Sequence, residues 1–203
     1  MSVDQYAVVE STPVYTGRVI SVRTDRLRMS DGTVATREIV EHPGAVAVLA
    51  LDDDDRVVVV NQYRHPVRQY LDELPAGLLD VSGEPALAAA RRELYEEAAL
   101  TASEWYVLVD LYTSPGMTDE AIRVFLARGL APIADADRFE PEHEEITLTV
   151  SRVPLDELVS RALSGELTNA TAVAGVSAAA ASRSLGWKDL RPADAPWPAR
   201  PGH

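Results

Sequence analysis

Cysteine is absent from the 203 residues of this chain. Its absence excludes a disulfide framework, a metal site built on thiolates and a cysteine nucleophile. The sequence also lacks any apolar run that approaches the roughly 18 residues of a membrane-spanning helix. Its first residues lack the basic and then apolar segment of a secretion signal. From these absences we expect a cytoplasmic protein without a membrane partner.

Basic residues are scarce as well. The chain has 19 Lys and Arg against 32 Asp and Glu, a formal net charge of −13 and a pI near 4.7. A surface this acidic repels nucleic acid and anionic lipid, so no nucleic-acid partner is expected. It would also repel a phosphorylated substrate unless the site held cations, and a bound metal ion would resolve that conflict. The hydrophobic share of 46% is otherwise typical of a globular domain.

The first 42 residues are expected to form a small antiparallel β unit. Three short extended runs occur there, and Asp31-Gly32 between two of them is a strong hairpin signal. Two apolar, β-branched runs at 45–51 and 57–63 follow, and four consecutive aspartates, Asp52–Asp55, join them. We interpret the aspartates as a solvated turn rather than a cation site.

Strands and helices alternate in the rest of the chain, which is expected to form one domain from 43 to 190. Residues 73–80 have the composition of a loop, and the tail at 191–203, with four prolines, is expected to lack regular structure. Further strands are expected at 105–112, 122–127 and 145–153, and helices from about residue 84, at 155–163 and at 171–185. This order favours an α/β sandwich with a mixed sheet over a doubly wound parallel sheet.

The first of these helices carries a cluster of acidic residues. Its apolar positions recur at helical spacing and predict one buried stripe of Leu87, Ala90, Leu94 and Ala98. Glu93, Glu96 and Glu97 lie three and four positions apart, so their carboxylates project from one side of the helix. Clustered oxygen ligands on a rigid element suit a hard divalent cation such as Mg²⁺. The alternative is a solvated acidic face that Arg91 and Arg92 balance.

The acidic helix is part of a longer pattern. Gly77 is followed by Glu84 and, after seven more residues, by Arg92-Glu93-Leu94-Tyr95-Glu96-Glu97. This pattern closely resembles the Nudix box, the signature of the Nudix hydrolase family. Two departures occur: six residues rather than five separate Gly77 from Glu84, and Ala99 stands where the family has a glycine. A left-handed backbone is easiest for glycine at that position, and neither departure removes a carboxylate.

Other segments resemble the ADP-ribose pyrophosphatase subgroup of that family. Glu73–Gly77 is similar to the loop before the box, and Pro115, sixteen residues beyond Ala99, is a mark of the subgroup. Shorter similarities lie at Arg37–Glu41, Gln62–Arg64, Thr118–Glu120 and Gly165–Ala170. The resemblance implies a Nudix α/β/α sandwich with a mixed sheet, preceded by a small antiparallel β unit. That unit is expected to pack across a two-fold partner and to contribute to the adenosine pocket. A homodimer is therefore expected.

The resemblance also implies the residues of a site. Two or three Mg²⁺ or Mn²⁺ ions are expected, with the ligands Ala76 (through its backbone carbonyl), Glu93, Glu96, Glu97 and Glu144. The expected substrate-binding residues are Arg37, Glu38, Arg64, Glu73, Leu78, Ser114, Pro115, Gly116 and Glu120. The expected catalytic residues are Glu97, Glu144 and Glu145.

The last two of these belong to an acidic segment, Glu140–Glu145, that would by itself be interpreted as a flexible loop. We favour Glu145 as the general base and Glu144 as a metal ligand, with Glu142 as a third candidate. The predicted reaction is metal-dependent hydrolysis of the pyrophosphate bond of ADP-ribose to AMP and ribose 5-phosphate. One alternative is a Nudix hydrolase of a nucleotide sugar, a dinucleotide or an oxidised nucleoside triphosphate. Another is a non-catalytic ADP-ribose sensor, although such a protein would be expected to have lost box carboxylates.

Overall fold

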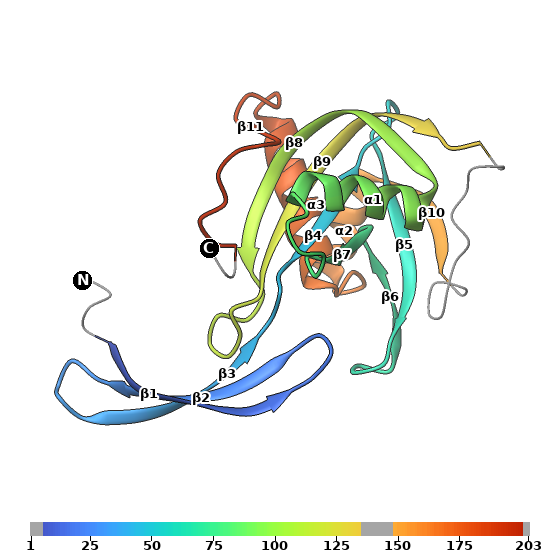
Figure 1. Ribbon diagram of the computed structural model, residues 1–203. Helices are drawn as coiled ribbons and strands as arrows, with labels where there is room; N and C mark the ends of the chain where they lie inside the picture. Colours follow the sequence, from blue (N-terminus) through green and yellow to red (C-terminus); the bar gives the residue numbers. More distant parts are fainter. Residues whose placement is uncertain (1–5, 135–147, 201–203) are drawn as a thin grey trace.

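A computed structural model of the chain describes residues 6–134 and 148–200 (Figure 1). The expected strand at 145–153 is described from residue 148 onward, whereas Glu142, Glu144 and Glu145 lie outside the described residues. No helix among the described residues is long and apolar enough to cross a membrane.

The N-terminal residues form a separate three-stranded antiparallel sheet, as predicted. Its strands are β1 (Ala7–Thr16), β2 (Ser21–Arg28) and β3 (Val34–Glu41), in that spatial order. The predicted hairpin at Asp31-Gly32 joins β2 to β3, and Gly32 there has a φ of 84°, which glycine adopts without strain. Figure 1 shows this sheet beside the body of the molecule, to which β3 leads. Every residue of β1 is exposed.

Two further sheets form the body. The larger has the order β11-β8-β9-β4-β7 and the smaller β10-β5-β6. Their bounds are β4 (Ala45–Ala50), β5 (Arg56–Arg64), β6 (Gln69–Glu73), β7 (Ala76–Leu78), β8 (Leu100–Tyr112), β9 (Ala121–Pro132), β10 (Thr149–Pro154) and β11 (Arg191–Pro192). Strand β4 pairs in parallel with β9 and antiparallel with β7. The predicted mixed sheet is therefore confirmed.

Helices cover both faces of the larger sheet (Figure 1). They are α1 (Ala86–Ala98), α2 (Leu155–Ser164) and α3 (Ala170–Ser184). Strand β4 is buried throughout because its side chains alternate between two cores. Leu49 packs with residues of α2 and α3, whereas Val48 packs with residues of α1. The result is the α/β/α sandwich that the sequence predicts.

The turn between β4 and β5 agrees with the sequence interpretation. Asp52 accepts hydrogen bonds from the backbone N–H groups of Asp54 (3.0 Å) and Arg56 (2.9 Å), and its carboxylate also pairs with Arg56 and Arg152. The aspartates thus form a turn closed by hydrogen bonds and ion pairs. The two strands that it joins belong to different sheets, and a single bridge, Leu51 to Val57, connects them.

Two segments are more regular than expected. Residues 73–80 contain β7, which pairs with an edge of β4 that would otherwise leave backbone groups unpaired. The expectation of a tail without regular structure is wrong at Arg191 and Pro192, which form β11 and pair with Val107 and Tyr106 of β8. In both cases a distant strand edge supplies the hydrogen-bonding partners, and local composition carries no signal of that edge.

Candidate active site

Helix α1 presents the predicted acidic cluster and has unusual ends. It begins after Pro85 without a side-chain cap, and it ends at Ala99 with φ 51° and ψ 43°, the left-handed conformation. The substitution of alanine for the usual box glycine therefore occurs where the backbone favours glycine. Ala90 and Leu94 of the predicted stripe are fully buried, and Leu87 and Ala98 are partly buried. This packing fixes which side of α1 faces the sheet.

Glu93 lies against the backbone of β7. Glu93 is only 8% exposed, so the alternative of a solvated acidic face is wrong for Glu93. A Cβ atom added at Gly77 would lie 1.9 Å from the Glu93 Oε1 atom. The box glycine is thus required by the close approach of a carboxylate. Glu97, one turn further on, accepts a hydrogen bond from the Ala76 N–H at 2.9 Å.

Arg92 connects three of the box carboxylates. Its guanidinium donates to both Glu84 oxygens (3.3 and 3.2 Å), to Glu93 Oε1 (2.6 Å) and to Glu96 Oε2 (3.0 Å). The hydrogen bond to Glu84 and the neighbouring negative charges outweigh burial and raise the pKa of Arg92. Arg92 therefore holds the acidic side chains together, and the predicted balancing role of Arg92 has a structural basis. Arg91 instead lies over the ring of Trp105, 5.8 Å from its centroid.

The oxygen atoms gathered here suit a hard divalent cation. Within residues 6–134 and 148–200, no three or more histidine, aspartate or glutamate residues are grouped so that they could hold a metal ion. Glu93 and Glu97, together with the β7 backbone at Ala76, nevertheless offer only hard oxygen donors, which Mg²⁺ and Mn²⁺ prefer. Phosphate or water oxygens would complete the set. The residues present therefore fit such an ion.

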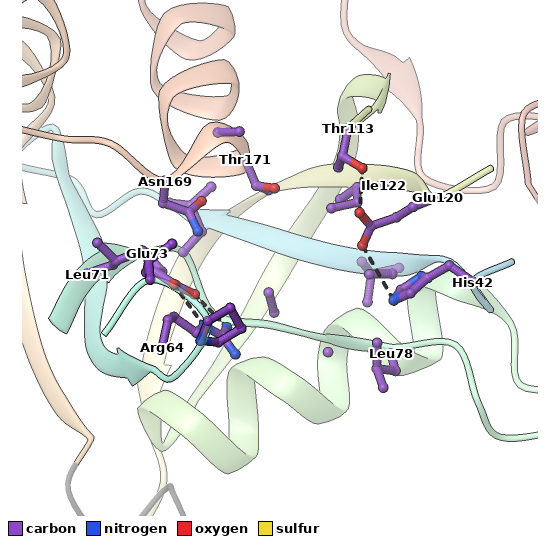
Figure 2. Close-up of a pocket in the computed structure, with 18 residues that line it drawn as sticks. His42, Arg64, Leu71, Glu73, Leu78, Thr113, Glu120, Ile122, Asn169 and Thr171 are labelled. Carbon is purple, nitrogen blue, oxygen red and sulfur yellow. Dashed lines mark hydrogen bonds and ion pairs between the residues drawn. The ribbon is translucent and has the colours of Figure 1, made fainter. Parts of the chain in front are cut away.

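A cavity of about 480 Å³, drawn in Figure 2, is lined by Ala76 and Gly77, the β7 residues that Glu97 and Glu93 contact. The predicted site residues that line it are Ala76, Arg64, Glu73, Leu78 and Glu120. Arg64 donates to both oxygens of Glu73, from Nε at 2.9 Å and from Nη2 at 2.6 Å, in a fork geometry. Glu73 is buried, whereas the Arg64 side chain is 42% exposed, so the cavity has a fixed cation at its wall.

The lining also includes polar residues that were not among the predicted site residues, such as His42, Thr113 and Asn169. Thr113 donates a short hydrogen bond to Glu120, whose other oxygen lies 3.5 Å from His42 Nε2, as Figure 2 shows. Asn169 caps α3 by accepting from the Ala172 N–H at 2.9 Å. An asparagine before an alanine-rich helix is a recognisable cap signal, but no local pattern marks His42 or Thr113.

The remaining predicted substrate residues lie elsewhere. Arg37, Glu38, Pro115 and Gly116 line a second hollow of about 590 Å³, between the N-terminal sheet and the segment that follows β8. The Ser114 carbonyl accepts hydrogen bonds from two backbone N–H groups within the same turn. Within one chain the predicted substrate residues other than Ser114 are therefore divided between two cavities.

Comparison with known proteins agrees with this geometry. The family model for the NUDIX domain matches residues 41–173. The chain is 46% identical to an ADP-ribose pyrophosphatase of Mycobacterium tuberculosis, over 99% of this chain and 95% of that protein. It is 36% identical to an ADP-ribose pyrophosphatase of Bacillus subtilis, over 77% and 83% of the two chains.

The fold also has a counterpart among solved structures. The crystal structure of an ADP compounds hydrolase superposes with a TM-score of 0.74 at 23% identity and covers 92% of this chain and 98% of that one. At this identity the likeness concerns the fold alone. Members of the Nudix family generally require divalent metal ions, which agrees with the oxygen donors beside β7. With the box carboxylates on α1, the glycine contact at β7 and a family match over residues 41–173, the chain belongs to the Nudix family of hydrolases.

Proposed function

We propose that this chain hydrolyses the pyrophosphate bond of ADP-ribose to AMP and ribose 5-phosphate. The observation that carries the proposal is the contact of Glu93 and Glu97 with the backbone of β7. The β7 residues Ala76 and Gly77 line the cavity together with Arg64. The two relatives named ADP-ribose pyrophosphatases support the choice of substrate, because each matches most of this chain.

The cavity is suited to part of a nucleoside diphosphate compound. Its volume of about 480 Å³ lies in the usual range for small-molecule sites. Apolar side chains such as Val46 and Ile122 line it together with the fixed charges of Arg64 and Glu120. Apolar walls would bury the non-ionic part of the substrate, and the guanidinium would attract its phosphates. Because Glu73 and Glu120 also line the cavity, bound metal ions would supply the further positive charge that a diphosphate needs.

Two or three Mg²⁺ or Mn²⁺ ions are proposed as cofactors. The proposed ligands are the Ala76 carbonyl, Glu93, Glu96, Glu97 and Glu144. Such ions would neutralise charge on the diphosphate and lower the pKa of a bound water. Glu145 would accept the proton of the attacking water at a carboxylate oxygen, with Glu144 and Glu142 as the alternatives. Arg92 would keep the carboxylates of α1 close together through its contacts with Glu84 and Glu93.

A homodimer is proposed as the active form. Arg37 and Glu38 lie on β3 and line a hollow other than the one beside α1. In a two-fold dimer, the N-terminal sheet of one chain could supply these residues to the site of the other. Exposed apolar residues on and beside this sheet are consistent with such a contact: Val8, Val9, Val14, Tyr15 and Ile20. Sedimentation equilibrium tests the assembly, and a monomer at enzyme-assay concentration would contradict it.

The reaction is tested by AMP release from ADP-ribose with Mg²⁺ or Mn²⁺, beside a panel of nucleotide sugars and dinucleotides. Glu97→Gln keeps an oxygen that can accept the Ala76 N–H, so we expect it to fold and to lose about 100-fold or more in rate. Glu145→Gln is expected to lose about 100-fold to 10,000-fold as a general base. Asp53→Asn, at an exposed turn, is the matched control.

The outcomes separate the alternative functions. Faster hydrolysis of a nucleotide sugar or dinucleotide would identify a Nudix hydrolase of that substrate instead. Binding of ADP-ribose without hydrolysis of any diphosphate would indicate a sensor and reject the proposed enzyme.

A further inference from the structure

The segment 191–200, named here the C-terminal strap, follows the outer edge of the larger sheet. Strand β11 pairs it to β8, and Figure 1 shows the strap running on beside that strand. Ala193, Ala195 and Trp197 pack against the core cluster that contains Ala89, Ala90 and Leu94 of α1. The strap therefore shares a core with the helix that carries the box carboxylates.

A buried arginine holds the strap in place. Arg123, on the central strand β9, is 3% exposed. It donates to the carbonyls of Ala195 (2.7 Å) and Pro196 (3.0 Å), and to both oxygens of Asp110 (2.7 and 3.0 Å). Its guanidinium also lies 4.9 Å from the ring centroid of Trp197. A charge this deeply buried requires such partners, and three of the four residues, Ala195, Pro196 and Trp197, belong to the strap.

Asp110, the acidic partner of Arg123, also pairs with Arg191, the first residue of the strap. Arg191 donates to Asp110 Oδ2 at 2.7 Å. Burial opposes the ionised form of Asp110, but the hydrogen bonds from Arg123 and Arg191 outweigh it and hold the pKa of Asp110 below its usual value. The strap is therefore held first by the ion pair between Arg191 and Asp110 and then by the hydrogen bonds from Arg123.

The far end of the strap meets the start of α1. Pro85, Ala86 and Leu87 line a hollow together with Trp197 and Arg200. Arg200 also donates to the Glu84 carbonyl at 3.4 Å. This helix end has no side-chain cap and no acidic residue in its first turn, so its own sequence does little to fix it. The contacts of the strap therefore add to the hydrogen bonds of Arg92 with Glu84 in holding this helix end.

A continuous series of hydrogen bonds connects the start of α1 to the box carboxylates. The side chain of Glu84 accepts two hydrogen bonds from Arg92, and Arg92 donates to Glu93 and Glu96. A shift of the segment before α1 would move Glu84, and with it the arginine that holds the carboxylates together. A change of about 1 Å in a catalytic group can cost about 100-fold in rate.

We propose that the C-terminal strap positions the box carboxylates by fixing the start of α1, and that Trp197 is its main positioning residue. The effect on catalysis rests on the proposed function, whereas the effect on α1 does not. Replacement of Trp197 by alanine removes the ring from Arg123 and from the hollow beside Leu87 while leaving the Asp110 ion pairs in place. The site itself keeps all of its residues.

The test is amide hydrogen exchange of the peptide region 84–94 in Trp197→Ala, without metal or substrate, combined with steady-state kinetics. We expect exchange of this region to become about tenfold faster, and kcat to fall about tenfold with less than a twofold change in KM. Trp197→Phe keeps a ring over Arg123 and is expected to retain most of the protection and activity. If the wild-type chain does not hydrolyse ADP-ribose, the exchange measurement still decides the role of the strap.

The matched control is Trp187→Ala. Trp187 also lies over an arginine, with Arg128 4.7 Å from its ring centroid, but it packs with the cluster on the other face of the sheet. This control is expected to lower the melting temperature without faster exchange at 84–94. Equal acceleration in both variants would show a general loss of stability and overturn the proposal. Unchanged exchange at 84–94 in Trp197→Ala would overturn it as well.

Discussion

Gly77→Ala is expected to separate catalysis from folding in this enzyme. The new Cβ would lie 1.9 Å from Oε1 and 2.1 Å from Cδ of Glu93, far inside normal contact distance. The obstructing atoms are the end of a flexible side chain, so Glu93 can rotate away while β7 stays paired with β4. The backbone of Gly77 is not left-handed and accepts alanine.

The magnitude follows from that geometry. The Glu93 carboxylate has to move by about 1 Å, and a displacement of that size costs about 100-fold in rate, or about 2.7 kcal/mol of activation free energy. The free energy of unfolding is expected to change by less than about 1 kcal/mol, because a glycine-to-alanine change in a permitted conformation restricts the unfolded chain. Gly77→Ala should therefore lower the catalytic rate strongly while leaving the free energy of unfolding almost unchanged.

The assay is AMP release at saturating metal concentration, with urea unfolding of the same preparation. Gly186→Ala is the control, because Gly186 has a φ of 69° and lies after α3, outside the site. It is expected to lose about 1–2 kcal/mol of stability and to keep its activity. Wild-type kcat/KM in Gly77→Ala would refute the argument that Glu93 must lie where it does. A loss of stability equal to that of Gly186→Ala would show that Gly77 serves the fold instead.

Two further predictions concern stability. Ala99→Gly is expected to raise the free energy of unfolding by about 1 kcal/mol, because Ala99 has a φ of 51°; an unchanged or lower melting temperature would contradict this. The folded-state pKa of Asp110 is lowered, so its ion pairs stabilise the fold above the unfolded-state pKa of about 4 and lose that contribution as the pH falls through the folded-state pKa. Urea unfolding of the wild type and Asp110→Asn should therefore differ most at neutral pH and converge in acid, and a constant difference down to acid pH would contradict the assignment.

Several features of the site follow from local sequence. The spacing of Glu93, Glu96 and Glu97 places them on one side of any helix, because helical geometry repeats every 3.6 residues. The glycine position of the box indicates a left-handed residue, and Ala99 adopts that conformation despite its side chain. The hairpin between β2 and β3 also follows from local sequence, because its turn residues Asp31 and Gly32 favour that turn.

Other features depend on contacts between distant residues. The sequence indicates loop structure at 73–80, yet β7 forms because the edge of β4 is available to it. No pattern in the chain shows that His42 and Thr113 meet at Glu120, because β-strand register and packing bring them together. The resemblance assigns Arg37 and Arg64 to one substrate site, whereas the tertiary structure places them at different cavities of a single chain.

The family, the acidic helix and the chemistry of its oxygen donors could be predicted from the sequence, because these depend on residue type and on spacing within a few turns. The position of that helix against the sheet could not, because it depends on tertiary packing. The contact of Glu93 with Gly77 and the contacts of Arg123 with the strap join residues that are far apart in the chain. Such contacts form only when the sheet, the helix and the tail pack together, since long-range packing has no local sequence period.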